Sequence, residues 1–232
     1  GIRRLSVAYL LTGAAPYAHR AAVLLDRVAD LYPTFDYARD GLMYEGRSTS
    51  CGHISYWCDD CFELRHLVLA YDAVRPALAG DEALVAFLSS RAHACGLANS
   101  KTCPEDLRRN VEERLLGEGL RDPERFRSNY PQTEVTLAII HGVLGGPAHE
   151  AQMEALLDEL IAHSVAVDGL TGEKGLANYA TMAPQTLALT LGLLARREPG
   201  LLERMLKRHP RLAQTYRFHI DTWCLERYYP LV

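Results

Sequence analysis

Aromatic and cationic side chains gather in and just after the segment 34–52, which reads TFDYARDGLMYEGRSTSCG. The segment is rich in turn formers and lacks helical periodicity, so it is predicted to be a long loop of the kind that usually carries function. Aromatic rings can stack on sugar rings, and arginine pairs with carboxylates or sulfates. The candidate binding residues of this region are Tyr44, Arg47, His53, Tyr56 and Trp57. Tyr56 and Trp57 have a second interpretation, as the core-facing start of a helix.

Cysteine and histidine in the same region raise the question of a metal. Cys58 and Cys61 have the spacing of zinc ligands, with Cys51 and His53 nearby. A structural zinc site usually has a second matched pair, and none follows at a suitable spacing. Buried helix cysteines are commoner, so no metal and no cofactor are predicted.

The acidic run Asp59-Asp60-Cys61-Phe62-Glu63 resembles the magnesium motif of terpene synthases, which are also helical enzymes. Their second motif has no good match, because Asn110-Val-Glu-Glu-Arg114 offers arginine where serine or threonine should stand. Acidic residues at a helix start also complement the helix dipole without any metal. A magnesium-dependent terpene synthase-like enzyme is kept as one alternative.

The elements that position these residues are predicted to be helices, because apolar residues recur at helical spacing almost everywhere. The first helix ends at Gly13, and the second begins at Pro16 and ends at Pro33. Its apolar face is predicted to carry Tyr17, Ala21, Leu24, Leu25, Val28 and Leu31. Asp81 is the expected N-cap of a helix at 82–98. The other expected helices cover about 54–77, 103–117, 131–145, 147–165, 181–196, 199–207 and 209–227.

This order predicts an all-α fold of repeated antiparallel helix hairpins. Such pairs stack as a solenoid or curl into an open α/α toroid. The sequence has no strict repeat of the kind that marks the common solenoid families, which favours an incomplete toroid formed by residues 1–232 as a single domain.

Composition narrows the possible functions. The 232 residues are 48% hydrophobic and 23% charged, the balance of a globular domain. The formal net charge of −4 provides no basic field for nucleic acid, so a nucleic-acid partner is not expected. No apolar run approaches the roughly 20 residues that span a bilayer. The oligomeric state is left open by the sequence.

Four segments, taken in order, resemble the helical domain of heparinase II/III-like proteins and their alginate lyase relatives. They are AYLLTGAAPYAHRAAVLLDRVADLYP, ISYWCDDCFELRHLVLAYDAVRP, SNYPQTEVTLAIIHGVLG and DGLTGEKGLANYATMAP. Each segment is degenerate alone, so the resemblance depends on their order, and together they cover most of the chain. The resemblance implies a toroid followed in whole proteins by a β-sandwich domain, which would lie beyond Val232.

The resemblance also implies an activity, the cleavage of an acidic polysaccharide by β-elimination. Asn129, ahead of Pro131, matches the asparagine that neutralises the sugar carboxylate, and Tyr179 matches the catalytic tyrosine. These roles suit an amide donor and a proton-transfer group. Asn129 is also a plausible helix N-cap, and Tyr179 a plausible aromatic plug beneath the preceding loop. The further candidate substrate contacts are Arg127, Tyr130, Lys174 and Asn178.

One departure from the resemblance affects catalysis. Some relatives have histidine directly after the asparagine, whereas this chain has Tyr130. Either Tyr130 substitutes for it, or the missing domain supplies the second acid–base group, or the chain is a non-catalytic glycan-binding or scaffold toroid. The leading prediction is a polysaccharide lyase, secreted or periplasmic, whose partner is an acidic polysaccharide or oligosaccharide.

Overall fold

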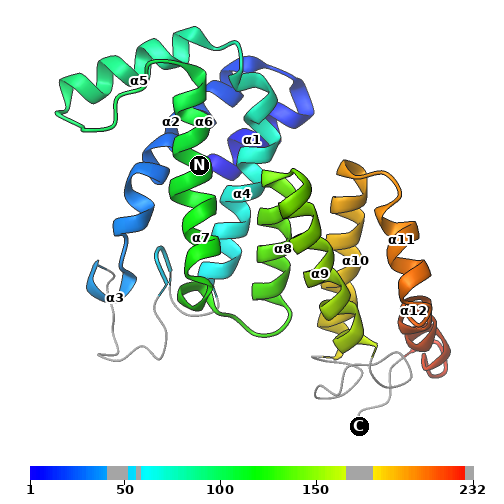
Figure 1. Cartoon of the computed structure of the whole chain (residues 1–232). Helices are drawn as coiled ribbons and strands as arrows, with labels where there is room; N and C mark the ends of the chain where they lie inside the picture. The colour runs from blue at the N-terminus through cyan, green and yellow to red at the C-terminus, as the bar shows by residue number, and fades with distance from the viewer. Residues whose placement is uncertain (41–51, 56–58, 166–179, 228–232) are drawn as a thin grey trace. The chain divides into compact units, whose positions relative to one another are not determined.

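In the computed structural model the chain is helical, as predicted, and no strand occurs among the described residues, which are 1–40, 52–55, 59–165 and 180–227 (Figure 1). The helices form two compact units, Gly1–Ser128 and Asn129–Val232. The predictions of a toroid and of one domain over 1–232 are not tested by this grouping. No described helix is both long and apolar enough to cross a membrane.

The first unit is built on a helical hairpin. α1 (Ile2–Thr12) ends at Gly13, whose φ of 67° is the left-handed conformation that glycine adopts without strain. α2 (Ala15–Leu31) follows with Pro16 in its first turn, and α4 (Asp59–Leu78) packs against both helices. The predicted end of the first helix at Gly13 and the predicted start of the second at Pro16 are therefore confirmed.

The remaining elements of the first unit are shorter. They are η1 (Tyr32–Thr34), α3 (Tyr37–Asp40), α5 (Glu82–Ala94), α6 (Pro104–Val111), the π-helical turn η2 (Glu112–Leu116), α7 (Gly117–Arg121) and η3 (Pro123–Phe126). α6 packs against α2. Asp81 caps α5 as predicted, since its Oδ1 accepts the Leu84 N–H at 2.8 Å.

The buried face of α2 differs from the prediction in two residues. Tyr17 and Leu24 are 36% and 41% exposed, whereas Ala18, Ala22 and Ala29 are buried. The small alanine side chains allow α1, α4 and α6 to approach α2, so the packed surface is centred on alanines rather than on the larger residues. Counting large apolar residues alone therefore misplaced the core face of this helix.

A charged cluster is buried beside α2. The Lys101 side chain is 1% exposed, and its Nζ lies 3.1 Å from Asp26 Oδ1 and 3.6 Å from Asp30 Oδ1. Nζ also donates to the Asn99 carbonyl, while Asn110 Nδ2 donates to Asp26 Oδ1 at 2.8 Å. Burial raises the pKa of Asp26, against the lowering effect of Lys101. The cluster thus joins α2, α6 and the segment between α5 and α6.

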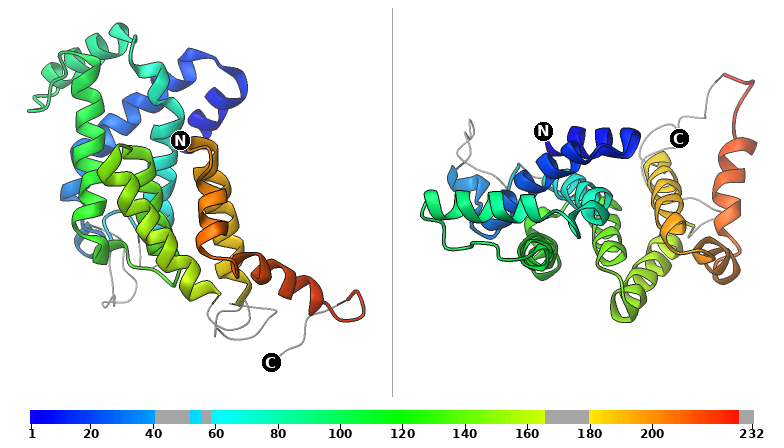
Figure 2. Two further views of the ribbon diagram at one scale, coloured as in Figure 1. Left: turned by 45° about the vertical axis from the view of Figure 1, so that its right-hand side comes forward. Right: turned by 90° about the horizontal axis from the view of Figure 1, so that it is seen from above.

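The second unit contains α8 (Gln132–Leu144), α9 (Pro147–Ser164), α10 (Ala180–Arg197), α11 (Leu201–Arg208) and α12 (Leu212–Asp221). α8 and α9 are antiparallel, and α10 packs against both (Figures 1 and 2). Gly142 permits this packing, because a Cβ there would lie 2.7 Å from Leu194 Cδ2 of α10. Val135, Ile139, Leu157, Ile161 and Leu187 form much of the core.

Several predicted helix ends were wrong, including the end of α5 at Ala94 rather than near residue 98. α12 stops at Asp221 rather than near residue 227, and Leu225 and Glu226 have φ values of 52° and 57°, which a right-handed helix excludes. The described part of α4 starts at Asp59, and Ile54 and Ser55, which the prediction placed at the start of this helix, lie in a bend. The Asp60 carboxylate accepts the N–H groups of Ile54 and Ser55 at 2.7 and 2.8 Å, which holds the preceding residues in a turn.

A pair of histidines joins α8 to α9. The Nδ1 atoms of His141 and His149 lie 2.8 Å apart, and the ring centroids are 5.1 Å apart, so one imidazole donates an N–H to the other. Burial lowers the pKa of His141, and His149 lowers it further. If both imidazoles were protonated, neither Nδ1 could accept a hydrogen bond, and two positive charges would be in contact.

Acidification is therefore expected to weaken the fold through His141. Because the folded-state pKa lies below the unfolded value near 6.5, this stabilisation is complete above about pH 6.5 and is lost as the pH falls through the folded pKa. In chemical unfolding at pH 5–7.5, His141→Gln should show a shallower fall in unfolding free energy, by at most about 1.4 kcal/mol per pH unit.

The other histidines with lowered pKa, His53, His66 and His219, affect the wild type and the variant equally. The difference between the two proteins therefore isolates the His141–His149 pair. His93→Gln, at an exposed position on α5, is the control and should leave the slope unchanged. Equal slopes for His141→Gln and the wild type would contradict the role of the pair.

Candidate functional site

Asn129 lies at the N-terminal end of α8, as the sequence predicted. Its side chain is exposed, and within the described part of the chain its amide makes no hydrogen bond. The N-cap of α8 is Pro131, which makes no side-chain cap bond. The backbone carbonyl of Asn129 accepts a hydrogen bond from the Gln132 N–H at 2.9 Å. The alternative role of Asn129 as a side-chain cap is therefore not seen, and the amide is accessible to a ligand.

Tyr130 is fixed against α9. Its hydroxyl donates to the Leu160 carbonyl at 3.2 Å, and its ring meets the edge of His163 with centroids 6.1 Å apart. Burial raises the pKa of Tyr130. A hydroxyl that is already hydrogen-bonded and harder to ionise is poorly suited to remove a proton.

His163 contacts Tyr130 and was not named by the sequence interpretation. It is exposed near the end of α9 and lies beside Tyr130, the residue after Asn129. α8 begins and α9 ends at the same end of their antiparallel pair, as Figure 1 shows. The spacing of 34 residues between Asn129 and His163 carries no local signal that could have linked them.

Arg127 is exposed at the end of the first unit. Its Nη1 lies 3.1 Å from Glu124 Oε2 in an i,i+3 pair, and the two side chains are 71% and 75% exposed. Exposed pairs of this kind contribute little to stability, so the guanidinium can exchange its partner for an anion at small cost. Its contact with substrate stays a prediction.

His53 occupies a different environment from the one expected for a substrate contact. It is 2% exposed, its Nδ1 lies 3.1 Å from the Tyr32 carbonyl oxygen, and its ring stacks on Tyr32 at 4.3 Å. Burial lowers the pKa of His53, and the Arg125 guanidinium acts in the same direction. A glycan could not reach this side chain without unpacking the first unit, so the contacts of His53 are structural.

The remaining predicted site residues lie outside the described residues. They are Tyr179, Lys174, Asn178, Tyr44, Arg47, Tyr56 and Trp57. Their roles stay predictions. In the sequence, Tyr179 directly precedes Ala180, the first residue of α10.

The acidic run of α4 does not gather as a magnesium site. Asp60 is fully buried, and its carboxylate accepts backbone N–H groups of His53, Ile54 and Ser55. Asp59 is exposed, and no group of three or more potential metal ligands occurs among the described residues. The terpene synthase-like alternative required these acids to face one deep apolar cavity, and the described residues do not meet that requirement.

The described cysteines Cys95, Cys103 and Cys224 are free thiols. Cys61 is fully buried on α4, which fits the prediction of a helix-borne thiol in the core. Cys51 and Cys58, the other members of the zinc pattern, lie outside the described residues.

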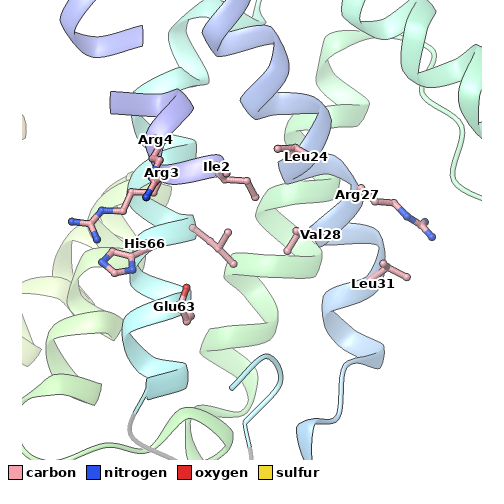
Figure 3. Close-up of a pocket in the computed structure, with 11 residues that line it drawn as sticks. Ile2, Arg3, Arg4, Leu24, Arg27, Val28, Leu31, Glu63 and His66 are labelled. Carbon is pink, nitrogen blue, oxygen red and sulfur yellow. The ribbon is translucent and has the colours of Figure 1, made fainter. Parts of the chain in front are cut away.

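A cavity of about 550 Å³ lies in the first unit between α1, α2 and α4 (Figure 3). Ile2, Leu24, Val28, Leu31 and Leu67 provide its apolar surface, and the polar side chains around it are Arg3, Arg4, Arg27, Glu63 and His66. In Figure 3 the Arg27 side chain extends away from the other labelled residues. The lining contains none of the predicted site residues, so volume alone does not identify the site around Asn129.

Comparison of the chain with protein-family models, with curated proteins and with solved structures found no match.

Proposed function

We propose that the chain is the helical domain of a polysaccharide lyase that cleaves a uronic-acid-containing glycan by β-elimination. The observation that carries the proposal is the exposed amide of Asn129, without a partner among the described residues, at the start of α8. The resemblance of four ordered segments to heparinase II/III-like proteins supports it. No metal or cofactor is part of the proposal.

In this reaction the proton on the carbon next to the sugar carboxylate is weakly acidic, and its removal places negative charge on the carboxylate. The Asn129 amide would donate a hydrogen bond to that oxygen, where a positioned donor contributes most. Tyr179 would supply proton transfer. With an ordinary pKa near 10, a tyrosine needs a cationic neighbour to act as a base, which Lys174 or an arginine would supply.

The test is direct because elimination creates a C4–C5 double bond that absorbs in the near ultraviolet. The purified protein is incubated with alginates, glycosaminoglycans and polyuronates, and the absorbance is followed. We expect an increase in absorbance with at least one acidic glycan and none with neutral glucans such as amylose. Failure of every acidic glycan to produce the absorbance would remove the lyase assignment.

A second candidate function is glycan binding without cleavage. It is favoured by Tyr130, which stands where some relatives have histidine and whose hydroxyl is bound to the Leu160 carbonyl. Isothermal titration with the same glycans separates the candidates. Binding that depends on Asn129 without any unsaturated product would establish the non-catalytic module. A polymeric acidic substrate also agrees with a secreted or periplasmic location.

A further inference from the structure

One apolar face of α2 borders a cavity instead of packing in the core. Leu24, Val28 and Leu31 follow one another at the spacing i, i+4 and i+7, which places them on one side of the helix. They line the cavity of about 550 Å³ between α1, α2 and α4, and Leu24 is 41% exposed. Ile2 of α1 and Leu67 of α4 complete an aliphatic surface that a ligand can contact.

The polar side chains of the cavity come mainly from α1 and α4. In Figure 3, Arg3, Arg4 and His66 lie on the opposite side of the view from Leu24 and Val28. Both arginines are exposed, and neither makes an ion pair with another described residue. Burial lowers the pKa of His66, and the positive charge of Arg3 lowers it further. The guanidinium groups of Arg3 and Arg4 are therefore available to an anion beside a neutral imidazole.

The charges of the lining favour an anion. Arg3 and Arg4 carry two positive charges, and Glu63, one turn of α4 from His66, carries one negative charge. Arg27 does not add to this balance, because its Nη1 lies 3.8 Å from Asp30 Oδ2 and its side chain extends away from the other labelled residues in Figure 3. A cavity with aliphatic residues on one side and two arginines on the other is complementary to an amphiphilic anion.

We propose that this cavity binds a small aliphatic carboxylate, with its hydrocarbon chain against Leu24, Val28 and Leu31 and its head group on Arg3 and Arg4. A guanidinium matches a carboxylate with two parallel N–H donors. The lining contains no phenylalanine, tyrosine or tryptophan, which favours a flexible chain over a flat aromatic ligand. None of the lining residues belongs to the proposed lyase site, so the inference does not depend on that function.

Isothermal titration with aliphatic carboxylates of increasing length tests the site. We expect one octanoate to bind per chain. The affinity should rise from butyrate through hexanoate to octanoate, by about fourfold for each methylene that becomes buried. Octanol has the same chain without the charge and should bind about tenfold more weakly than octanoate. Octyltrimethylammonium, with a positive head group, should bind more weakly still.

Replacing the two arginines tests recognition of the head group. The double variant Arg3→Gln with Arg4→Gln should weaken octanoate binding about tenfold or more and leave octanol binding unchanged. Both positions are exposed, so the variant is expected to fold, which circular dichroism checks. The matched control is Arg91→Gln with Arg109→Gln, which removes the same charge from exposed positions of α5 and α6. This control should bind octanoate as the wild type does.

Filling the cavity tests the position of the chain. Leu24→Trp places a larger side chain in the cavity and should abolish the binding of both octanoate and octanol. Leu10→Trp makes the same substitution at a position of α1 that is 64% exposed and lies outside the lining. It should bind both ligands as the wild type does.

Three results would overturn the proposal. Octanoate that binds no more tightly than octanol would show that the cavity does not recognise the charge. Equal octanoate affinity in the Arg3 and Arg4 double variant and in its control would remove the arginines from the site. Unchanged binding in folded Leu24→Trp would place the ligand elsewhere. The lyase proposal is tested separately by the absorbance of the unsaturated product, so either proposal can fail without the other.

Discussion

Replacing Lys101 with methionine is expected to lower the free energy of unfolding by about 3–5 kcal/mol. Lys101 is 1% exposed and is the cation closest to the carboxylates of Asp26 and Asp30 in this cluster. Methionine fills a similar volume but leaves the buried carboxylate of Asp26 with the Asn110 amide as its side-chain donor, while Asp30 keeps a longer pair with Arg27 at 3.8 Å. The large effect comes from this uncompensated charge rather than from the loss of a favourable pair.

The same substitution should change the pH dependence of stability. Burial already raises the pKa of Asp26, and Lys101 is the largest influence that lowers it. Removing Lys101 therefore raises that pKa further. A group with a raised folded pKa stabilises the fold at low pH and loses this contribution as the pH rises through the folded pKa. The deficit of Lys101→Met relative to the wild type should therefore shrink on acidification.

Urea unfolding at several pH values, monitored by circular dichroism, measures both effects. Lys207→Met, at an exposed position of α11, is the matched control and should change stability by about 0.5 kcal/mol or less. The double variant Asp26→Asn with Lys101→Met should recover part of the loss, because it removes one stranded charge. If Lys101→Met has the same free energy of unfolding as Lys207→Met, Lys101 does not compensate the buried carboxylates.

Asn129→Ala is expected to reduce kcat for the glycan by about 10²–10³-fold, the usual effect of removing one donor from a developing negative charge. The unfolding free energy should change by about 0.5 kcal/mol or less, because the side chain is exposed and does not cap α8. Absorbance kinetics and urea unfolding on the same preparation separate the effect on kcat from the effect on the unfolding free energy. The effect on kcat should exceed any effect on KM.

Two further variants sharpen this prediction. Gln214→Ala removes an exposed amide from α12 and should leave the kinetics unchanged. Asn129→Asp keeps the shape of the side chain but directs a negative charge at the substrate carboxylate, so it should be at least as damaging as alanine. Full activity in Asn129→Ala would exclude Asn129 from catalysis. A loss of activity accompanied by a comparable loss of unfolding free energy would indicate a structural role instead.

The local sequence determined where most helices begin and end. Gly13 ends α1 in the left-handed conformation, Asp81 caps α5 through the Leu84 N–H, and α8 ends before Gly145. Such signals act between residues no more than a few positions apart. They can therefore be read from composition and spacing before any packing is known.

The exposed position of Asn129 could also be predicted from the sequence. The residue precedes Pro131, which begins the first turn of α8, so a loop-to-helix junction follows from local chemistry. The same reasoning allowed a side-chain cap, and only the structure showed that the Asn129 amide is not used in that way. Its chemical role still depends on the resemblance and the proposed experiments.

The tertiary structure alone decided which polar residues are buried and which meet. Lys101 contacts Asp26 although the two residues are 75 positions apart in the chain, and His53 lies against Tyr32 in the interior rather than on a surface. The pairing of Tyr130 with His163 likewise required α8 and α9 to pack antiparallel. These contacts join residues far apart in sequence, and they depend on how whole helices pack, which no spacing within one segment specifies.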